Sequence, residues 1–259
     1  MTVHEFGEKN EDVLVLFHPL GVRWDVFNYV IPTLQKHYHL VIPALPGFDP
    51  DMPKTDFTSV EQIADEMASW LMHHGLDSIT CLYGCSLGGA VVAQMLATRK
   101  ISVDCAVIDG GMTPYQLWKP LTYLIGIRDF IMLEIGKHMS IKALRGMFDP
   151  EKYTENDVAY IKEAMSGMSA KTIWHSFYSC NNYSMPKSAP SINCRIAYWY
   201  GSAEKGPRKW DIAYIRKMFP HAQIIENAGM DHAEFFTLHP EEFCKKLTAW
   251  IYLSARDKR

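Results

Sequence analysis

The chain has 259 residues, 48% hydrophobic and 21% charged, which fits one large globular α/β domain with room for an insertion. Its formal net charge of −3 implies no basic surface, so nucleic acid is not expected as a partner. Because no run of about 18 apolar residues occurs, a transmembrane helix is excluded. The six cysteines form no C-x-x-C pair and no signal-peptide pattern is visible, so we expect reduced thiols and a cytoplasmic protein.

The first part of the chain alternates short apolar runs with segments of helical period, the pattern of a mostly parallel sheet with helices on both faces. Val13–Phe17, for example, is a continuous apolar run, as in strands buried on both faces. Ser59 is placed to cap a helix that starts at Val60, with Gln62 completing a capping box. We expect strands at 13–17, 39–43, 79–83 and 103–108, and helices at 24–36, 60–74 and 87–98.

Between the strand at 79–83 and the helix at 87–98 lies Gly84-Cys85-Ser86-Leu87-Gly88, a G-x-S-x-G pentapeptide. A serine on such a sharp strand-to-helix turn has strained backbone angles, which are tolerated only beside small neighbours. The turn lifts the hydroxyl clear of the sheet, at the positive end of the helix, where a developing oxyanion is stabilised. The pentapeptide alone also fits a tight turn with an incidental serine, but the strand before it and the helix after it favour a nucleophile.

The alternation stops after Asp109-Gly110-Gly111 and resumes near residue 195. Residues 112–190 hold no clear strand, so we expect a helical lid, inserted after the sixth strand, over the sheet edge where open α/β sheets bind ligands. The core domain would then comprise residues 1–111 and 191–259. Within the lid we expect helices at 115–124, 127–137, 140–146, 155–165 and 169–180. After it we expect strands at 195–200 and 223–226, and helices at 210–218 and 240–255.

With this order of elements, the chain resembles the α/β-hydrolase fold family in its smaller capped form, from about Val13 to Leu253. In that family a nucleophile elbow is followed by an acid and then by a histidine. The resemblance implies that Ser86 is the nucleophile and that His232, in Gly229-Met230-Asp231-His232, is the general base. Serine needs such a base, and an imidazole with a pKa of about 6.5 can take its proton and return it.

The acid of the implied triad has two candidates. Glu204 lies just past a strand that ends at Gly201, where the family usually has an aspartate and less commonly a glutamate. Asp109 ends the preceding strand, at a site that some members use for the acid, but it also suits a turn with Gly110. We favour Glu204 and keep Asp109 as the alternative.

The resemblance also implies an oxyanion hole made of two backbone N–H groups. One belongs to Leu87, directly after the nucleophile. The other comes from the loop His18-Pro19-Leu20-Gly21, where proline has no N–H, so Leu20 is the expected donor. Many members read His-Gly here, and the proline stiffens the approach to the hole. We expect His18 to brace the loop by hydrogen bonding.

Aromatic and methionine side chains are frequent in residues 112–190, and most would pack the lid on the core. We expect a largely hydrophobic pocket whose walls include Trp24, Trp118, Trp174 and Met230. The predicted function is a serine hydrolase, without cofactor or metal, acting on a small hydrophobic carboxylic ester as a monomer or homodimer. The alternatives are a C–C bond hydrolase, lactonase, amidase or acyltransferase, and a ligand-binding or receptor protein on the same fold.

Overall fold

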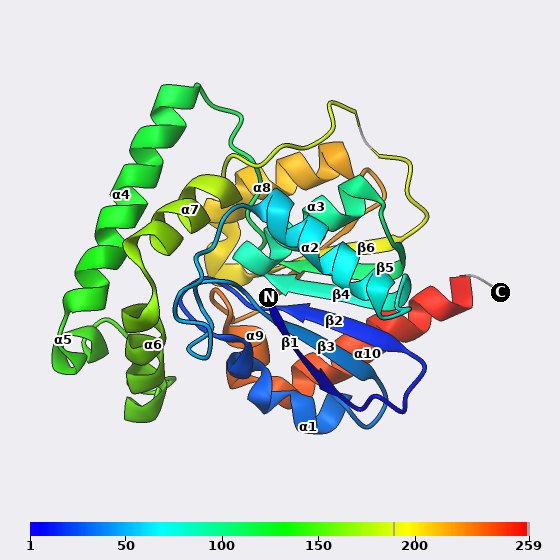
Figure 1. The fold of residues 1–259 in the computed structure, drawn as a ribbon, viewed down its shortest axis with the longest axis horizontal. Helices are drawn as coiled ribbons and strands as arrows, with labels where there is room; N and C mark the ends of the chain where they lie inside the picture. The colour runs from blue at the N-terminus through cyan, green and yellow to red at the C-terminus, as the bar shows by residue number, and fades with distance from the viewer. Residues whose placement is uncertain (189, 258–259) are drawn as a thin grey trace.

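The computed structural model describes residues 1–188 and 190–257, and a seven-stranded sheet forms its centre (Figure 1). The strand order is β1-β3-β2-β4-β5-β6-β7, and the neighbouring strands are parallel except for β1 and β3. The strands are β1 (Thr2–Phe6), β2 (Val13–Phe17), β3 (His39–Ala44), β4 (Ser78–Cys85), β5 (Ser102–Asp109), β6 (Arg195–Gly201) and β7 (Gln223–Asn227). The mostly parallel sheet confirms the predicted fold class.

Helices cover both faces of the sheet (Figure 1). One face carries α2 (Val60–His73), α3 (Leu87–Thr98) and α8 (Lys205–Met218), and the other carries α1 (Ile31–Leu34) and α10 (Pro240–Asp257). Strand β2 contributes side chains to the apolar layers on both faces of the sheet. Val15 and Phe17 pack toward α2 and α3, whereas Leu14 and Leu16 pack toward α1 and α10. All five residues of β2 are buried, as its continuous apolar run predicts.

A helical segment separates β5 from β6 and projects to one side of the sheet (Figure 1). It contains α4 (Lys119–His138), α5 (Ile141–Arg145), α6 (Glu155–Gly167) and α7 (Ala170–Cys180). The sequence predicted this segment after the sixth strand. It follows the fifth, β5, because β1 is the only described strand before β2 and no extra strand lies between β2 and β5. Its helices match the predicted pieces, except that the two expected at 115–124 and 127–137 form one continuous helix, α4.

The N-terminal part differs from the expectation in two places. Strand β1 is absent from the sequence interpretation, and it pairs antiparallel with β3 at the edge of the sheet. The helix expected at 24–36 is broken into a 3₁₀ helix, η1 (Trp24–Tyr29), and the short α1. Pro32 lies in the first turn of α1. Proline is accommodated there but would disrupt the interior of one continuous helix over 24–36, so the helix is broken before it.

The N-terminus of α2 has only one of the two hydrogen bonds of the expected capping box. Ser59 Oγ accepts a hydrogen bond from the backbone N–H of Gln62, as predicted. The side chain of Gln62 donates instead to Glu66 Oε1, one turn further along the helix, at 2.8 Å. The single cap bond therefore replaces the reciprocal capping box.

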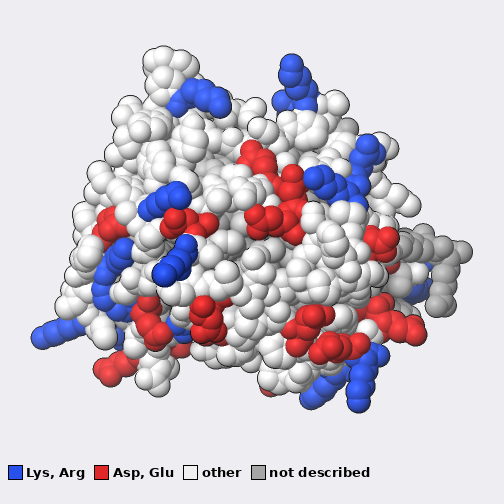
Figure 2. Space-filling view, viewed as in Figure 1, with Lys and Arg blue, Asp and Glu red and all other residues white. Residues whose placement is uncertain are grey.

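The surface carries charges of both signs. On the face seen in Figure 2, acidic and basic side chains lie interspersed over the helices. Within the described residues, no helix is long and apolar enough to cross a membrane. Five of the cysteines, namely Cys81, Cys85, Cys105, Cys180 and Cys244, are buried and carry no disulfide.

Candidate active site

Ser86 lies on the turn between β4 and α3, with the strained backbone that the pentapeptide predicts. Its φ is +54° and its ψ is −113°, in a region that side-chain-bearing residues rarely occupy. Two backbone hydrogen bonds hold the turn: Ser86 N–H donates to Asp109 O at 2.9 Å, and Met112 N–H donates to Ser86 O at 3.3 Å. The loop after β5 thus fixes the strained conformation.

Glycines let α3 pass close to the sheet at this turn. A Cβ added to Gly84 would lie 2.2 Å from the carbonyl oxygen of Gly88, and one added to Gly88 would lie 2.3 Å from that of Phe17. Both distances are far below van der Waals contact, and both partners are backbone atoms that cannot rotate away. The pentapeptide therefore needs glycine at positions 84 and 88 for packing alone.

This packing gives a stability prediction for Gly88→Ala. The added methyl group forces α3 away from β2, and we expect a loss of roughly 3 kcal/mol or more in the free energy of unfolding. Chemical denaturation measures the loss. Gly136→Ala in α4 is the matched control, because a Cβ there meets nothing within 4 Å, and it should be neutral or slightly stabilising. Equal stabilities of the two variants would contradict the close approach.

His232 and Glu204 lie in direct contact. His232 follows β7 on a loop, and its Nδ1 is 2.6 Å from Glu204 Oε2. The loop bends sharply on both sides of the imidazole, with positive φ at Gly229 and at Ala233. Asp231 N–H donates to Glu234 Oε2 at 2.8 Å, which ties the loop to the start of α9 (Glu234–Leu238).

Glu204 is buried, with 5% of its surface exposed, in the short 3₁₀ helix η2 (Ser202–Glu204) that follows β6. The N–H of Gly201 donates to its Oε1 at 3.1 Å, and Arg208 Nε donates to its Oε2 at 2.9 Å. Burial alone would raise the pKa of Glu204, but the hydrogen bond and charge of His232 and the charge of Arg208 outweigh it and lower the pKa to about 2. The side chain is therefore an anion at neutral pH.

Arg208 is a member of this network that the sequence interpretation missed. It lies one helical turn after Glu204, and it also donates to Asp211 Oδ2 at 3.1 Å. Asp211 in turn accepts hydrogen bonds from the backbone and the hydroxyl of Thr113. The i,i+4 spacing of Glu204 and Arg208 was a visible signal, but it is equally common on solvated helices.

The segment after β5 is the shared neighbour of Ser86 and His232. Asp109 O accepts the N–H of Ser86, as described above, and the next residue lies against the imidazole. A Cβ added to Gly110 would lie 3.0 Å from His232 Nδ1 and 3.3 Å from Glu204 Oε2. Glycine here, at a φ of +54°, lets the ring approach the sheet edge that also carries Ser86.

Asp109, the alternative acid, contacts a different partner. Its Oδ2 accepts a hydrogen bond from Tyr83 OH at 2.7 Å, on the side of the sheet covered by α10. Burial raises its pKa to about 6, and the charge of Glu204 adds to this, while the hydrogen bond from Tyr83 opposes it. The geometry therefore favours Glu204 over Asp109 as the partner of His232.

The loop after β2 is braced by His18, which is fully buried. Leu45 N–H donates to His18 Nε2 at 3.4 Å, so Nδ1 carries the ring proton and donates it to Pro19 O at 2.9 Å. Burial lowers the pKa of His18 to about 4, which keeps the ring neutral at pH 7. Leu20 follows in this braced loop, and Leu87 is the first residue of α3, where a backbone N–H has no partner within the helix.

The four residues expected to line the pocket each have different neighbours, and none of them lines either of the two hollows described below. Trp24 stacks on His4 with ring centroids 3.7 Å apart, and Trp118 is 77% exposed beside α4. Trp174 stacks on Tyr178 within the helical segment. Met230 is buried in the layer under α9 and α10. A pocket with these four walls therefore stays a prediction.

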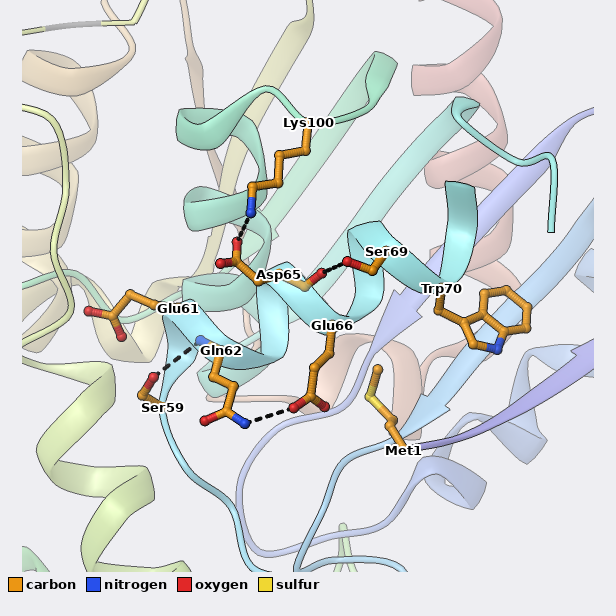
Figure 3. Close-up of a pocket in the computed structure, with 9 residues that line it drawn as sticks. All are labelled: Met1, Ser59, Glu61, Gln62, Asp65, Glu66, Ser69, Trp70 and Lys100. Carbon is orange, nitrogen blue, oxygen red and sulfur yellow. Dashed lines mark hydrogen bonds and ion pairs between the residues drawn. The ribbon is translucent and has the colours of Figure 1, made fainter. Parts of the chain in front are cut away.

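Two hollows occur elsewhere in the described chain. One runs along the outer side of α2, where Figure 3 shows polar side chains, and none of the candidate catalytic residues lines it. Its lining residues are Met1, Ser59, Glu61, Gln62, Asp65, Glu66, Ser69, Trp70 and Lys100. The other has a volume of about 290 Å³ and lies between residues 47–55 and α6. Phe48 lines this second hollow and packs edge-on against His18, at 5.3 Å between ring centroids.

Comparison with known proteins places this chain in a family. A family model described as alpha/beta hydrolase fold matches residues 12–192, well over half of the chain. The chain belongs to the α/β hydrolase fold family. Ser86 lies within the matched residues, whereas Glu204 and His232 lie beyond them.

Individual similar proteins match either a short part of the chain or the whole fold at low sequence identity. A pimeloyl-[acyl-carrier protein] methyl ester esterase from Sodalis glossinidius is 36% identical over 86 residues, which is 33% of this chain and 31% of that protein. An esterase from Thermogutta terrifontis has a TM-score of 0.73 at 16% identity, covering 98% of this chain and 93% of its own. A bromoperoxidase from Bacillus anthracis has a TM-score of 0.77 at 18% identity, covering 96% and 94%. At such identities the structural likeness establishes the fold alone.

Proposed function

We propose that this protein is a serine hydrolase that cleaves small, largely hydrophobic carboxylic esters. The observation that carries the proposal is the 2.6 Å contact between His232 Nδ1 and the buried, anionic Glu204, beside the segment that holds Ser86 in its strained turn. An imidazole whose Nδ1 is hydrogen-bonded to a carboxylate has its Nε2 available as a base. That arrangement supports activation of a neighbouring hydroxyl group.

In the proposed mechanism, Ser86 Oγ attacks the ester carbonyl while His232 Nε2 takes the hydroxyl proton. Glu204 stabilises the imidazolium that forms and keeps the ring in orientation. The N–H groups of Leu20 and Leu87 stabilise the oxyanion of the tetrahedral intermediate. His232 returns the proton to the departing alcohol, and it then deprotonates a water molecule that releases the acid from the acyl-enzyme.

The helical segment α4–α7 would act as a lid over this site. It is tied to the loop of His232 by an ion pair, since Lys152 Nζ lies 2.9 Å from Glu234 Oε2, the oxygen that also accepts Asp231 N–H. It is tied to the core a second time by Arg23 and Glu163 of α6, at 2.7 Å. These contacts support a lid whose position is coupled to the proposed base.

The ester class is supported by two similar proteins. The Sodalis relative is named a methyl ester esterase, and the Thermogutta protein is described as an esterase.

A panel of p-nitrophenyl esters of rising acyl length tests the proposal. We expect hydrolysis of the shorter esters, with kcat/KM of at least about 10⁴ M⁻¹s⁻¹ for the best of them. Chelator should leave the rate unchanged. Absence of turnover across the whole panel, with a folded protein, would contradict the ester assignment.

A further inference from the structure

The exposed hydrophobic surface of the molecule is concentrated on the helical segment. Of the sixteen large hydrophobic side chains that are exposed in the described chain, ten lie between residues 117 and 147. Figure 1 shows α4 at the outer rim of the molecule, with α7 on its inner side. The exposed hydrophobic side chains on or beside α4 are Leu117, Trp118, Leu121, Tyr123, Leu124, Ile131, Met132 and Ile135.

The inner face of α4 is already occupied by α7. Thr122 Oγ1 donates to Asn182 Oδ1 at 2.9 Å, just beyond the end of α7. Gly126 lies against the ring of Trp174, and Phe130 contacts the same ring edge-on. Because a helix advances about 100° per residue, these positions place Arg128 at the centre of the opposite, outward face.

The outward face has a symmetric pattern about Arg128. Leu124 and Met132 lie four residues before and after it, and Leu121 and Ile135 lie seven residues before and after it. Leu124, Met132 and Ile135 are each about 60% exposed. If a second α4 lies antiparallel across a two-fold axis at Arg128, Leu124 faces Met132 of the second copy, and Leu121 faces its Ile135. Such self-complementarity is what a two-fold interface requires.

We propose that α4 pairs antiparallel with α4 of a second copy of this chain, about a two-fold axis at Arg128. The hydrophobic side chains of the outward face are 43–64% exposed in the single chain, namely Leu121, Leu124, Ile131, Met132 and Ile135. The largest exposed apolar patch on a protein surface is often an interaction site. Covering it with a second copy removes this surface from solvent.

The charged residues of α4 favour a second copy over a lipid surface as the occupant. Arg128 lies in the middle of the apolar stripe, where insertion into a bilayer would carry its charge toward the acyl chains. It is paired with Asp129 at 2.7 Å. In the antiparallel pair, each Arg128 also comes beside Asp129 of the second copy, so the central charges are balanced.

Sedimentation equilibrium over about 1–100 µM protein tests the pairing. The wild-type chain should be a dimer, and the double variant Leu124→Glu/Met132→Glu should raise the dissociation constant at least about 100-fold. Both side chains are exposed, so circular dichroism and the unfolding midpoint should stay unchanged. Met72→Glu, on the exposed side of α2, is the matched control and should remain dimeric.

A cysteine at the axis tests the geometry separately. Arg128→Cys should form a covalent dimer under mild oxidation, because the axis brings the two copies of residue 128 together, whereas Met72→Cys should not. A monomeric wild-type chain would overturn the proposal, as would a dimer that the double variant leaves intact. A monomer that binds anionic phospholipid vesicles through α4 would also overturn it. None of these outcomes depends on ester hydrolysis.

Discussion

Ser86→Ala is expected to lower kcat for ester hydrolysis by about 10³–10⁶-fold, the range seen when a serine nucleophile is removed. The cause is the loss of the only oxygen that the proposal allows to attack the carbonyl. Steady-state assays with the best p-nitrophenyl ester measure the effect. KM should change little, because the pocket keeps its shape.

The strained backbone at Ser86 supplies an internal check on this variant. Alanine must adopt the same φ of +54°, so the strain remains and the free energy of unfolding should stay within about 1 kcal/mol of the wild type. Ser176→Ala is a matched control, since Ser176 is buried in α7 outside the proposed site. Residual activity within tenfold of the wild type in a pure Ser86→Ala preparation would contradict the nucleophile assignment.

Glu204→Gln is expected to lower kcat by about 10²–10⁴-fold, the second largest effect. The amide cannot stabilise an imidazolium, and its NH₂ group competes for the contact with His232. Asp109→Asn is the matched control at the alternative acid. Its side chain can still accept the hydrogen bond from Tyr83, so it should retain activity within about tenfold. A larger loss in Asp109→Asn than in Glu204→Gln would reverse the assignment of the acid.

The same pair of variants differs in how stability depends on pH. The folded-state pKa of Asp109 is raised from 3.8 to about 6, so its contribution is fully present below the unfolded pKa and is lost as pH rises through 6. This loss amounts to about 3 kcal/mol and should vanish in Asp109→Asn. The folded-state pKa of Glu204 is lowered from 4.5 to about 2, so its contribution is present above pH 4.5 and is lost as pH falls toward 2. Denaturant titrations at pH 2, 4 and 8 separate the two groups, because the change between pH 4 and 8 reports mainly Asp109 and the change between pH 4 and 2 reports mainly Glu204.

Local patterns were enough to predict most of the fold. The continuous apolar run of β2, and the glycine-bounded serine between β4 and α3, each specify their conformation through neighbours in sequence. Strand β1 was missed because its half-buried, partly charged residues carry little apolar signal, and its pairing with β3 depends on distant residues. Helix α4 was divided in the prediction at Ile125-Gly126, and Gly126, which weakens a helix locally, is accommodated because it packs against Trp174.

The sequence predicted the candidate site only for residues that come shortly after the end of a strand. Ser86, Glu204 and His232 each follow a strand, so their position along the chain indicates the same sheet edge. Tyr83 was missed because it contacts Asp109 from a neighbouring strand, 26 residues away. Arg208 was missed because its spacing from Glu204 is equally common on solvated helices. The four pocket residues were chosen by side-chain type, and type does not say whether a tryptophan packs on His4 or on Tyr178.

Labelling with a fluorophosphonate, followed by intact-mass and peptide mass spectrometry, tests the central claim most directly. The account predicts one probe molecule per chain, attached to Ser86, with ester hydrolysis lost in proportion to labelling and Ser86→Ala left unlabelled. Labelling confined to another residue, or full activity in a protein that the probe does not modify, would contradict it.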